Sequence, residues 1–356
     1  MNSYFKSTQF KNWKKTKEEI QKIQQKKIER VLKRIREVNS IIKEENEKLS
    51  HSTDSNELTK QTNFQRYIKP KSLENLNEKE KILIMEYSKK LIRILNNQSK
   101  KSSSCKCTTI TYFRRFFLKK SILDYDPSFL MAAACFLGSK VTQVSKSLSD
   151  MEKIFTILEN NEKKLYEYEF YLSTILEYEF FVYNPYQALI GLIYNLEQKE
   201  FFLSQNSQNY VNPNEFKQEC IDIIDQMHLT DNIFMFTYSE IALASIFIKC
   251  EEKKLNTINI AEKLEIDKII NVKEFLEGPV EEMKKNLEMI PKYENSGEEF
   301  QKSQEIYKLI CKFHKDFPQY QRKLDLERKT LKKKMDDFTS DFGLLLKKFN
   351  LEPKQK

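Results

Sequence analysis

The sequence DYDPSFLMAAACFLGSK, residues 124–140, decides the fold of this chain. Asp126 is suited to cap a helix, and Pro127 is suited to the first helical position, where a missing backbone N–H costs nothing. Residues 127–139 are almost all apolar and mostly small. A helix that is apolar on every side belongs at the centre of a bundle. This one ends at Lys140, a residue type that is rarely buried without a partner.

Helical patterns surround this central segment and complete a set of five helices. The other four are predicted at 77–95, with Asn77 as its cap, and at 102–120, 148–158 and 161–179. Together they outline a bundle over residues 76–180.

A second set of five helices follows the break at Asn184-Pro185. Its members are predicted at 185–196, 213–229, 237–251, 258–266 and 267–290. The third is again apolar and rich in small residues, and IALASIFIKC reaches a lysine, Lys249, at the same end; the sequence shows no partner for it. We therefore expect an all-α chain built from two copies of a five-helix unit, at 76–180 and 181–290.

Composition supports helices and places positive charge at the N terminus. The 356 residues include only 5 Gly and 8 Pro, and the net charge is +9. Residues 11–48 hold thirteen Lys or Arg against seven Asp or Glu, a net of +6. Residues 1–75 are expected to form a basic amphipathic helix, at 15–49, and a polar loop, at 50–63. A basic arm can bind nucleic acid or an acidic protein surface.

The region 291–356 is a predicted C-terminal helical extension. Its apolar residues recur at gaps of three or four, the pattern of a helix seam. We expect this extension to lie on the bundle or on the N-terminal helix rather than to form a free coiled coil.

The sequence offers no catalytic constellation. It has no phosphate-binding glycine loop, no kinase catalytic loop and no nucleophile paired with a base. The six cysteines and three histidines lack zinc-site spacing, so neither a metal nor a cofactor is expected. No apolar run has the length of a membrane span or a secretory signal, which predicts a soluble, intracellular protein.

Three longer strings carry a resemblance to a known family. They are TYFRRFFLKKSILDYDPSFLMAAACFLGSKV (111–141), LYEYEFYLSTILEYEFFVYNPY (165–186) and HLTDNIFMFTYSEIALASI (228–246). They resemble the cyclins, in particular the transcription-associated ones. The resemblance spans residues 76–290 and implies the cyclin fold, in which each five-helix unit is a cyclin box.

The resemblance also implies a binding site for a kinase. In cyclins a lysine at the end of the third helix and a glutamate in the fifth pair and hold the C-helix of the kinase. Lys140 and Glu169, 29 residues apart, match them, while Leu137, Tyr178 and Phe180 match positions that line an apolar socket. From the residues alone, Lys140 could instead cap its helix and Glu169 could be an ordinary surface charge.

The function implied is that of a non-catalytic activator in the nucleus, with the cytoplasm as a second compartment. The expected partner is a cyclin-dependent kinase (CDK), in a CDK-activating kinase or the kinase module of TFIIH, with a RING-type assembly factor as a third subunit. The implied substrates are other CDKs and the RNA polymerase II tail. The residues 141–143 lack the acidic pair that follows this lysine in many cyclins, and no substrate-docking patch appears around 89–93.

Three alternatives stay open at this point. The chain could be a different transcription-type cyclin. It could be a TFIIB-like double cyclin fold that binds DNA, which the basic arm favours and the absence of any Cys before Cys105 disfavours. It could also be a scaffold built on its terminal helices.

Overall fold

The computed structural model describes residues 2–51, 75–98, 102–144, 146–202 and 211–290, together with scattered residues between 301 and 340. All regular structure within these ranges is helical. The polar insertion predicted at 50–63 lies almost wholly outside the described residues, as do residues 341–356. No described helix is both long and apolar enough to cross a membrane.

Five helices form the first repeat, around a central α6. They are α4 (Leu76–Asn96), α5 (Ser103–Lys119), α6 (Pro127–Val141), α7 (Leu148–Ile154) with a 3₁₀ turn at Thr156–Leu158, and α8 (Glu162–Ile175). Helix α6 packs against α4, α5 and α8. Its residues Leu130 to Cys135 are all inaccessible to solvent or nearly so, as expected for the middle of a bundle.

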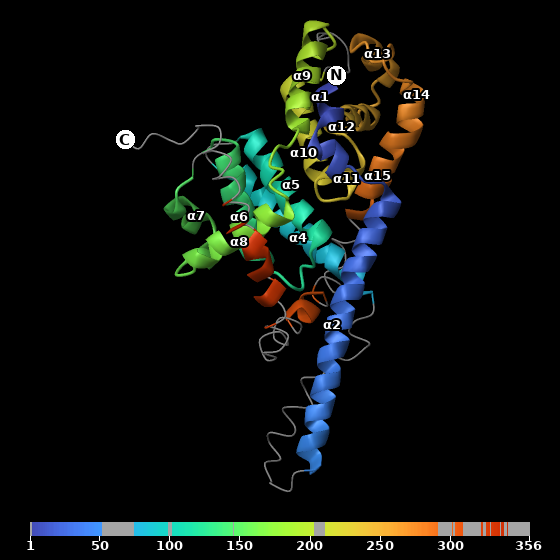
Figure 1. Cartoon of the computed structure of the whole chain (residues 1–356). Coiled ribbons are helices and arrows are strands. Elements are labelled where there is room, and N and C mark those ends of the chain that lie inside the picture. Colours follow the sequence, from blue (N-terminus) through green and yellow to red (C-terminus); the bar gives the residue numbers. More distant parts are fainter. Residues whose placement is uncertain are drawn as a thin grey trace, which may run out of the picture.

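The second repeat has the same plan around a central α12. Its helices are α9 (Pro185–Gln198), α10 (Pro213–Met227), a short α11 (Asn232–Met235), α12 (Tyr238–Glu252), α13 (Thr257–Lys263), α14 (Val272–Phe275) and α15 (Glu281–Leu287). Helix α12 packs against α9 and α10 and belongs to a second hydrophobic core, separate from that of α6. Figure 1 shows the two repeats as adjacent bundles. The all-α double-repeat architecture is confirmed.

The ends of α6 follow from local chemistry. The Asp126 carboxylate accepts the backbone N–H of Ser128 at 2.8 Å, and Pro127 occupies the first turn, as predicted. Near the other end, Gly138 lets α6 approach α5 closely, because a Cβ at Gly138 would lie 2.5 Å from Oγ1 of Thr109. The C-terminal part of α6, which carries Lys140, therefore packs closely against α5.

The N-terminal region contains more structure than the predicted helix. A short α1 (Asn2–Lys6) and a π-helical turn, Gln9–Trp13, precede α2 (Lys17–His51). We call Gln9–Trp13 the strap. Helix α2 runs from the second repeat past the first and extends beyond it (Figure 1). Lys27 of α2 and Glu80 of α4 form an ion pair at 2.9 Å in which the side chains are only 4% and 1% exposed.

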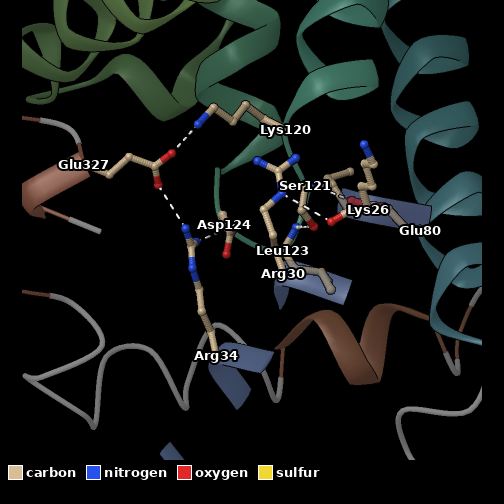
Figure 2. A network of polar contacts seen from close by, with 10 residues as sticks. Lys26, Arg30, Arg34, Glu80, Lys120, Ser121, Leu123, Asp124 and Glu327 are labelled. Carbon is tan, nitrogen blue, oxygen red and sulfur yellow. Dashed lines mark hydrogen bonds and ion pairs between the residues drawn. The ribbon is translucent and has the colours of Figure 1, made fainter. Parts of the chain in front are cut away.

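The described part of the C-terminal extension lies against the first repeat and α2. Ile306, Tyr307 and Leu331 pack against the first core. Glu327 bonds Lys120, at the end of α5, and also Arg34 of α2 at 3.2 Å; Arg34 in turn contacts Asp124 at 3.3 Å (Figure 2). For these residues, the expected packing on the bundle and on the N-terminal helix is confirmed.

Several helix ends differ from prediction. The cap of α4 is Asn75, with a left-handed φ of 54° and no side-chain cap bond, so Asn77 lies inside the helix. The predicted helix 267–290 begins only at Val272 and contains a π-helical turn, Leu276–Val280, at Pro279, whose nitrogen cannot donate the α-helical bond. The domain boundaries at 75, 180 and 290 stay predictions.

Helix α8 ends at Ile175, four residues before its predicted end. The N–H of Tyr178 bonds the carbonyl of Ser173 at 3.0 Å, and Glu177 and Tyr178 both take left-handed φ angles, 56° and 59°. Two successive left-handed residues without glycine are uncommon, and the surrounding structure must hold them. Residues 176–183, which we call the connector, therefore form a turn that links the repeats.

Candidate functional site

The structure brings Lys140 and Glu169 together. The Lys140 ammonium, in the last turn of α6, lies 2.7 Å from Oε1 and 3.0 Å from Oε2 of Glu169 on α8. The lysine side chain is 49% exposed, whereas that of the glutamate is 15% exposed. The pair is thus anchored on the glutamate side and open to solvent on the lysine side.

Aromatic rings fix the position of the lysine. The Lys140 ammonium lies 3.9 Å from the centre of the Phe136 ring, one turn earlier on α6, and Phe136 contacts Tyr166 edge-on at 6.1 Å. A cation over an aromatic face is attracted by the ring quadrupole. The helix C-terminus also favours a positive charge. Tyr166 and Val141 are exposed apolar neighbours of this pair in sequence.

This arrangement leaves bonding capacity for a partner. An ammonium has three N–H donors, and a carboxylate has about four lone-pair positions. Because the pair uses only part of this capacity, it can still donate to a carbonyl and accept from an N–H group of another chain. Lys140 lies in the last turn of α6, where a positive charge is favoured, and it also pairs with Glu169.

Two of the three predicted socket residues, Leu137 and Phe180, share the first hydrophobic core. Leu137 is buried in the first core, and Phe180 packs against that core. The rings of Tyr178 and Phe180 lie 6.1 Å apart on the connector, and the Tyr112 hydroxyl donates to the carbonyl of Phe180. Tyr178 and Phe180, which we call the connector group, thus lie together on the connector.

The strap binds the connector through two hydrogen bonds. The sequence did not predict this contact. The indole N–H of Trp13 donates to Glu179 at 2.7 Å, and the N–H of Tyr183 donates to the side-chain carbonyl of Gln9 at 2.7 Å. The charged groups of Arg115 and Lys119 lie 4.7 and 4.4 Å from the Trp13 ring. The one sequence feature that points to a special role for this segment is that Trp13 is the only tryptophan in the chain.

Electrostatics around the strap are shaped by burial. Burial lowers the pKa of Arg115 to about 10, although Tyr112 and Glu179 oppose this shift. Its guanidinium still donates to the carbonyl of Glu179 at 3.4 Å. Lys119 bonds the Glu177 carboxylate at 2.6 Å, so basic side chains of α5 hold both ends of the left-handed turn.

The corresponding lysine of the second repeat is paired within its own bundle. Lys249 lies 2.6 Å from Glu252 and 3.9 Å from Glu219, and its side chain is 16% exposed. The sequence had shown no partner for Lys249. Both lysines are paired with a carboxylate, but the Lys249 side chain is much less exposed than that of Lys140, so the two repeats differ at this position. Within the described ranges, no group of three or more His, Cys, Asp or Glu could hold a metal ion.

Two five-helix repeats in series, each around a small-residue third helix, form a double cyclin fold. Residues 184–312 match the family model of the cyclin C-terminal domain. A chain in the structure of the CAK complex from Chaetomium thermophilum bound to ATP-γ-S has the same fold, with a TM-score of 0.61, 22% identity, and coverage of 87% of this chain and 88% of that one.

Curated cyclins are similar to parts of this chain. Cyclin-H of Xenopus laevis is 26% identical over 190 residues, covering 51% of this chain and 56% of the relative. Cyclin CCL1 of Saccharomyces cerevisiae is 25% identical over 248 residues, covering 70% of this chain and 58% of the relative. The chain is a cyclin H-like protein, and its matches span little more than half the length of these relatives.

Proposed function

We propose that this chain is the regulatory subunit of a cyclin-dependent kinase of the CDK-activating type. The observation that carries the proposal is the bidentate Lys140–Glu169 pair, half exposed at the end of the buried α6. The similarity to cyclin H supports the choice of kinase class. The expected substrates are other CDKs and the RNA polymerase II tail, and the expected compartment is the nucleus.

The mechanism is selection of one kinase conformation. The first repeat presents a rigid surface, with Lys140 and Glu169 positioned to bond backbone groups at the end of the kinase C-helix and with the connector group beside the apolar side chains of that helix. A C-helix held inward completes the kinase's own Lys–Glu pair and its ATP site. The cyclin contributes binding energy to the active conformation and no catalytic group.

The partial exposure of the pair predicts different effects on folding and on binding. A pair with an exposed partner contributes about 0.2–1 kcal/mol to folding. Covered by a kinase, the same pair loses its solvent, and removal of one partner costs about 2–5 kcal/mol of binding free energy. Lys140→Ala and Glu169→Ala should therefore weaken kinase binding far more than they lower the stability of the free chain.

The test uses the full chain and a CDK-activating-type kinase. Binding is measured by titration calorimetry, and activation is measured as phosphate transfer to a peptide of the RNA polymerase II tail. Lys249→Ala is the matched control, since it removes the equivalent lysine from the second repeat. Loss of binding and activation in Lys140→Ala and Glu169→Ala, but not in Lys249→Ala, would support the proposal.

The opposite result would reject the assigned site. Unchanged kinase activation in the Lys140→Ala/Glu169→Ala double variant would show that the kinase binds elsewhere. A chain that fails to activate any CDK but shifts duplex DNA at low salt would instead be a DNA-binding double cyclin fold. A RING-type assembly factor and TFIIH are proposed as further partners, and co-purification with the kinase tests them.

A further inference from the structure

A groove lined by several lysines runs along the N-terminal segment, and neither Lys140 nor Glu169 belongs to its walls. Its walls include Lys11, Lys14, Lys15 and Lys17 from the N-terminal segment and Met235 from α11. The proposed kinase contact uses none of these residues.

The groove continues into a cavity at the junction of α2 with both repeats. This cavity has a volume of about 210 Å³ and shares Lys17 and Met235 with the groove. Its walls are mainly apolar and include the buried Ile84, Met85 and Leu118. A space of this size accepts one large apolar side chain.

One wall residue of the cavity has an unused acceptor. The side chain of Gln24 is 6% exposed and donates through Nε2 to Asp231 at 3.2 Å. Its Oε1 accepts no hydrogen bond within the part of the chain that the structure describes. An unpaired buried carbonyl costs free energy, and an occupant that brings an N–H group next to Gln24 would reduce this cost.

The groove has cations without carboxylate partners. Lys11, Lys14 and Lys15 form no ion pair with any described residue, whereas Lys17 lies 3.3 Å from Glu282. The backbone around them is fixed, because the N–H of Lys15 donates to the carbonyl of Phe234 at 2.8 Å and that of Lys14 to Gln9 at 3.0 Å. These lysines thus start from an ordered backbone, which lowers the entropy cost of binding an anion.

The groove also contains three acidic side chains, Glu18, Glu19 and Glu282. Glu282 contacts Lys17, and the carboxylate of Glu19 accepts the N–H of Thr16 at 2.8 Å. Glu18 is exposed and also lines the groove, so four lysines stand against three glutamates, and the excess positive charge is small. A ligand that matches the groove and the cavity carries negative charges next to a single apolar group.

We propose that this groove and cavity bind an acidic peptide segment with one large apolar side chain. The apolar side chain fills the cavity, and Asp or Glu residues on either side of it pair with Lys11, Lys14 and Lys15. A nucleic-acid backbone could neutralise the same lysines, but it has no apolar group to fill the cavity. The combination therefore favours a peptide over DNA or RNA.

The experiment measures fluorescence anisotropy with the full chain and short labelled probes. The first probe is a peptide of Asp, Glu and Ser with a central Phe. The second replaces Phe with Ser, the third replaces the acids with their amides, and the fourth is duplex DNA. Only the first should bind well, and its affinity should fall as salt is added, because exposed ion pairs are screened.

Variants locate the binding site. Lys11→Gln/Lys14→Gln/Lys15→Gln should weaken binding of the first probe about tenfold, which is about 1.4 kcal/mol for three exposed pairs. The matched control, Lys22→Gln/Lys26→Gln/Lys33→Gln, removes the same charge from exposed positions of α2 outside the groove and should bind normally. Met235→Trp, which narrows the cavity entrance, should lower the affinity of the chain for the first probe. It should leave the already weak affinity for the second probe unchanged.

Three results would overturn the proposal. They are absence of binding by the first probe, equal weakening by the control triple variant, and tighter binding of duplex DNA than of the acidic peptide. Thermal melting of each variant shows whether it is folded. If the triple variant does not fold, probe binding is measured with Lys11→Gln alone, which changes an exposed position.

Discussion

The indole N–H of Trp13 donates to the carboxylate of Glu179 at 2.7 Å and joins two residues 166 positions apart. This bond ties the N-terminal strap to the connector between the repeats. The connector carries Tyr178 and Phe180, so the N-terminal segment supports part of the proposed kinase-binding surface. Its removal should affect the connector before it affects the bundle cores.

Trp13→Phe should lower the free energy of unfolding by about 2 kcal/mol, because a hydrogen bond to a charged group is lost while the ring remains. Urea unfolding measures the change. Hydrogen exchange of the amides at 177–183 should speed up more than that of α6. Glu179→Gln, which keeps an acceptor oxygen, should be milder; equal exchange rates in the parent and Trp13→Phe would contradict this role of the strap.

Lys27→Met should be among the most damaging single changes. It leaves the Glu80 carboxylate buried without its cation, and breaking a buried pair in this way costs about 3–5 kcal/mol. Adding Glu80→Gln should recover most of the loss, because glutamine can still accept the N–H of Ile122, now bonded to Glu80 at 2.8 Å. Chemical denaturation of the single and double variants checks this, and a double variant as unstable as Lys27→Met would disagree.

Two glycine-to-alanine substitutions should change the stability of the chain in opposite directions. Gly138→Ala would place a Cβ 2.5 Å from Oγ1 of Thr109, whereas a Cβ at Gly191 meets nothing within 4 Å. We expect Gly138→Ala to destabilise the chain by about 1–3 kcal/mol through overpacking. Gly191→Ala, in an exposed helix position, should stabilise it by up to about 1 kcal/mol. Thermal unfolding of both variants provides the measurement; stabilisation by Gly138→Ala would show that α5 and α6 can separate at little cost.

Stability should fall in mild acid because of His228. Burial lowers the pKa of its imidazole from 6.5 to about 4, in a site with Asp225, Tyr186, Lys106 and Cys107. Between these values the unfolded chain binds a proton that the folded chain does not. The contribution of the neutral His228 to the free energy of unfolding is therefore complete above about pH 6.5. It decreases by about 3 kcal/mol as the pH falls to 4.

The check is a series of urea denaturations from pH 7 to pH 4 on the parent and on His228→Gln. The variant cannot titrate at this position, so its stability should decline less over that window. Only the difference between the two slopes is attributed to His228, because carboxylates titrate in both proteins. Parallel slopes would show that His228 is protonated in the folded state.

The sequence by itself determined the elements whose signals are local. Asp126, Pro127 and the apolar run to Ser139 defined α6, because capping and periodicity act within a few residues. The repeat of this pattern around Lys249 indicated the double fold. The spacing of Lys140 and Glu169, read through the cyclin resemblance, predicted the ion pair that the structure contains.

Only the tertiary structure decided the contacts between distant segments. The bonds Trp13–Glu179 and Lys27–Glu80 leave no periodic signal, because neither partner's neighbours constrain the other. The early end of α8 depends on the groups that hold Glu177 and Tyr178 in left-handed conformations, and these come from α5 and the strap. Local sequence thus indicated where the helices form, whereas packing decided how far each paired lysine is exposed, 16% for Lys249 and 49% for Lys140.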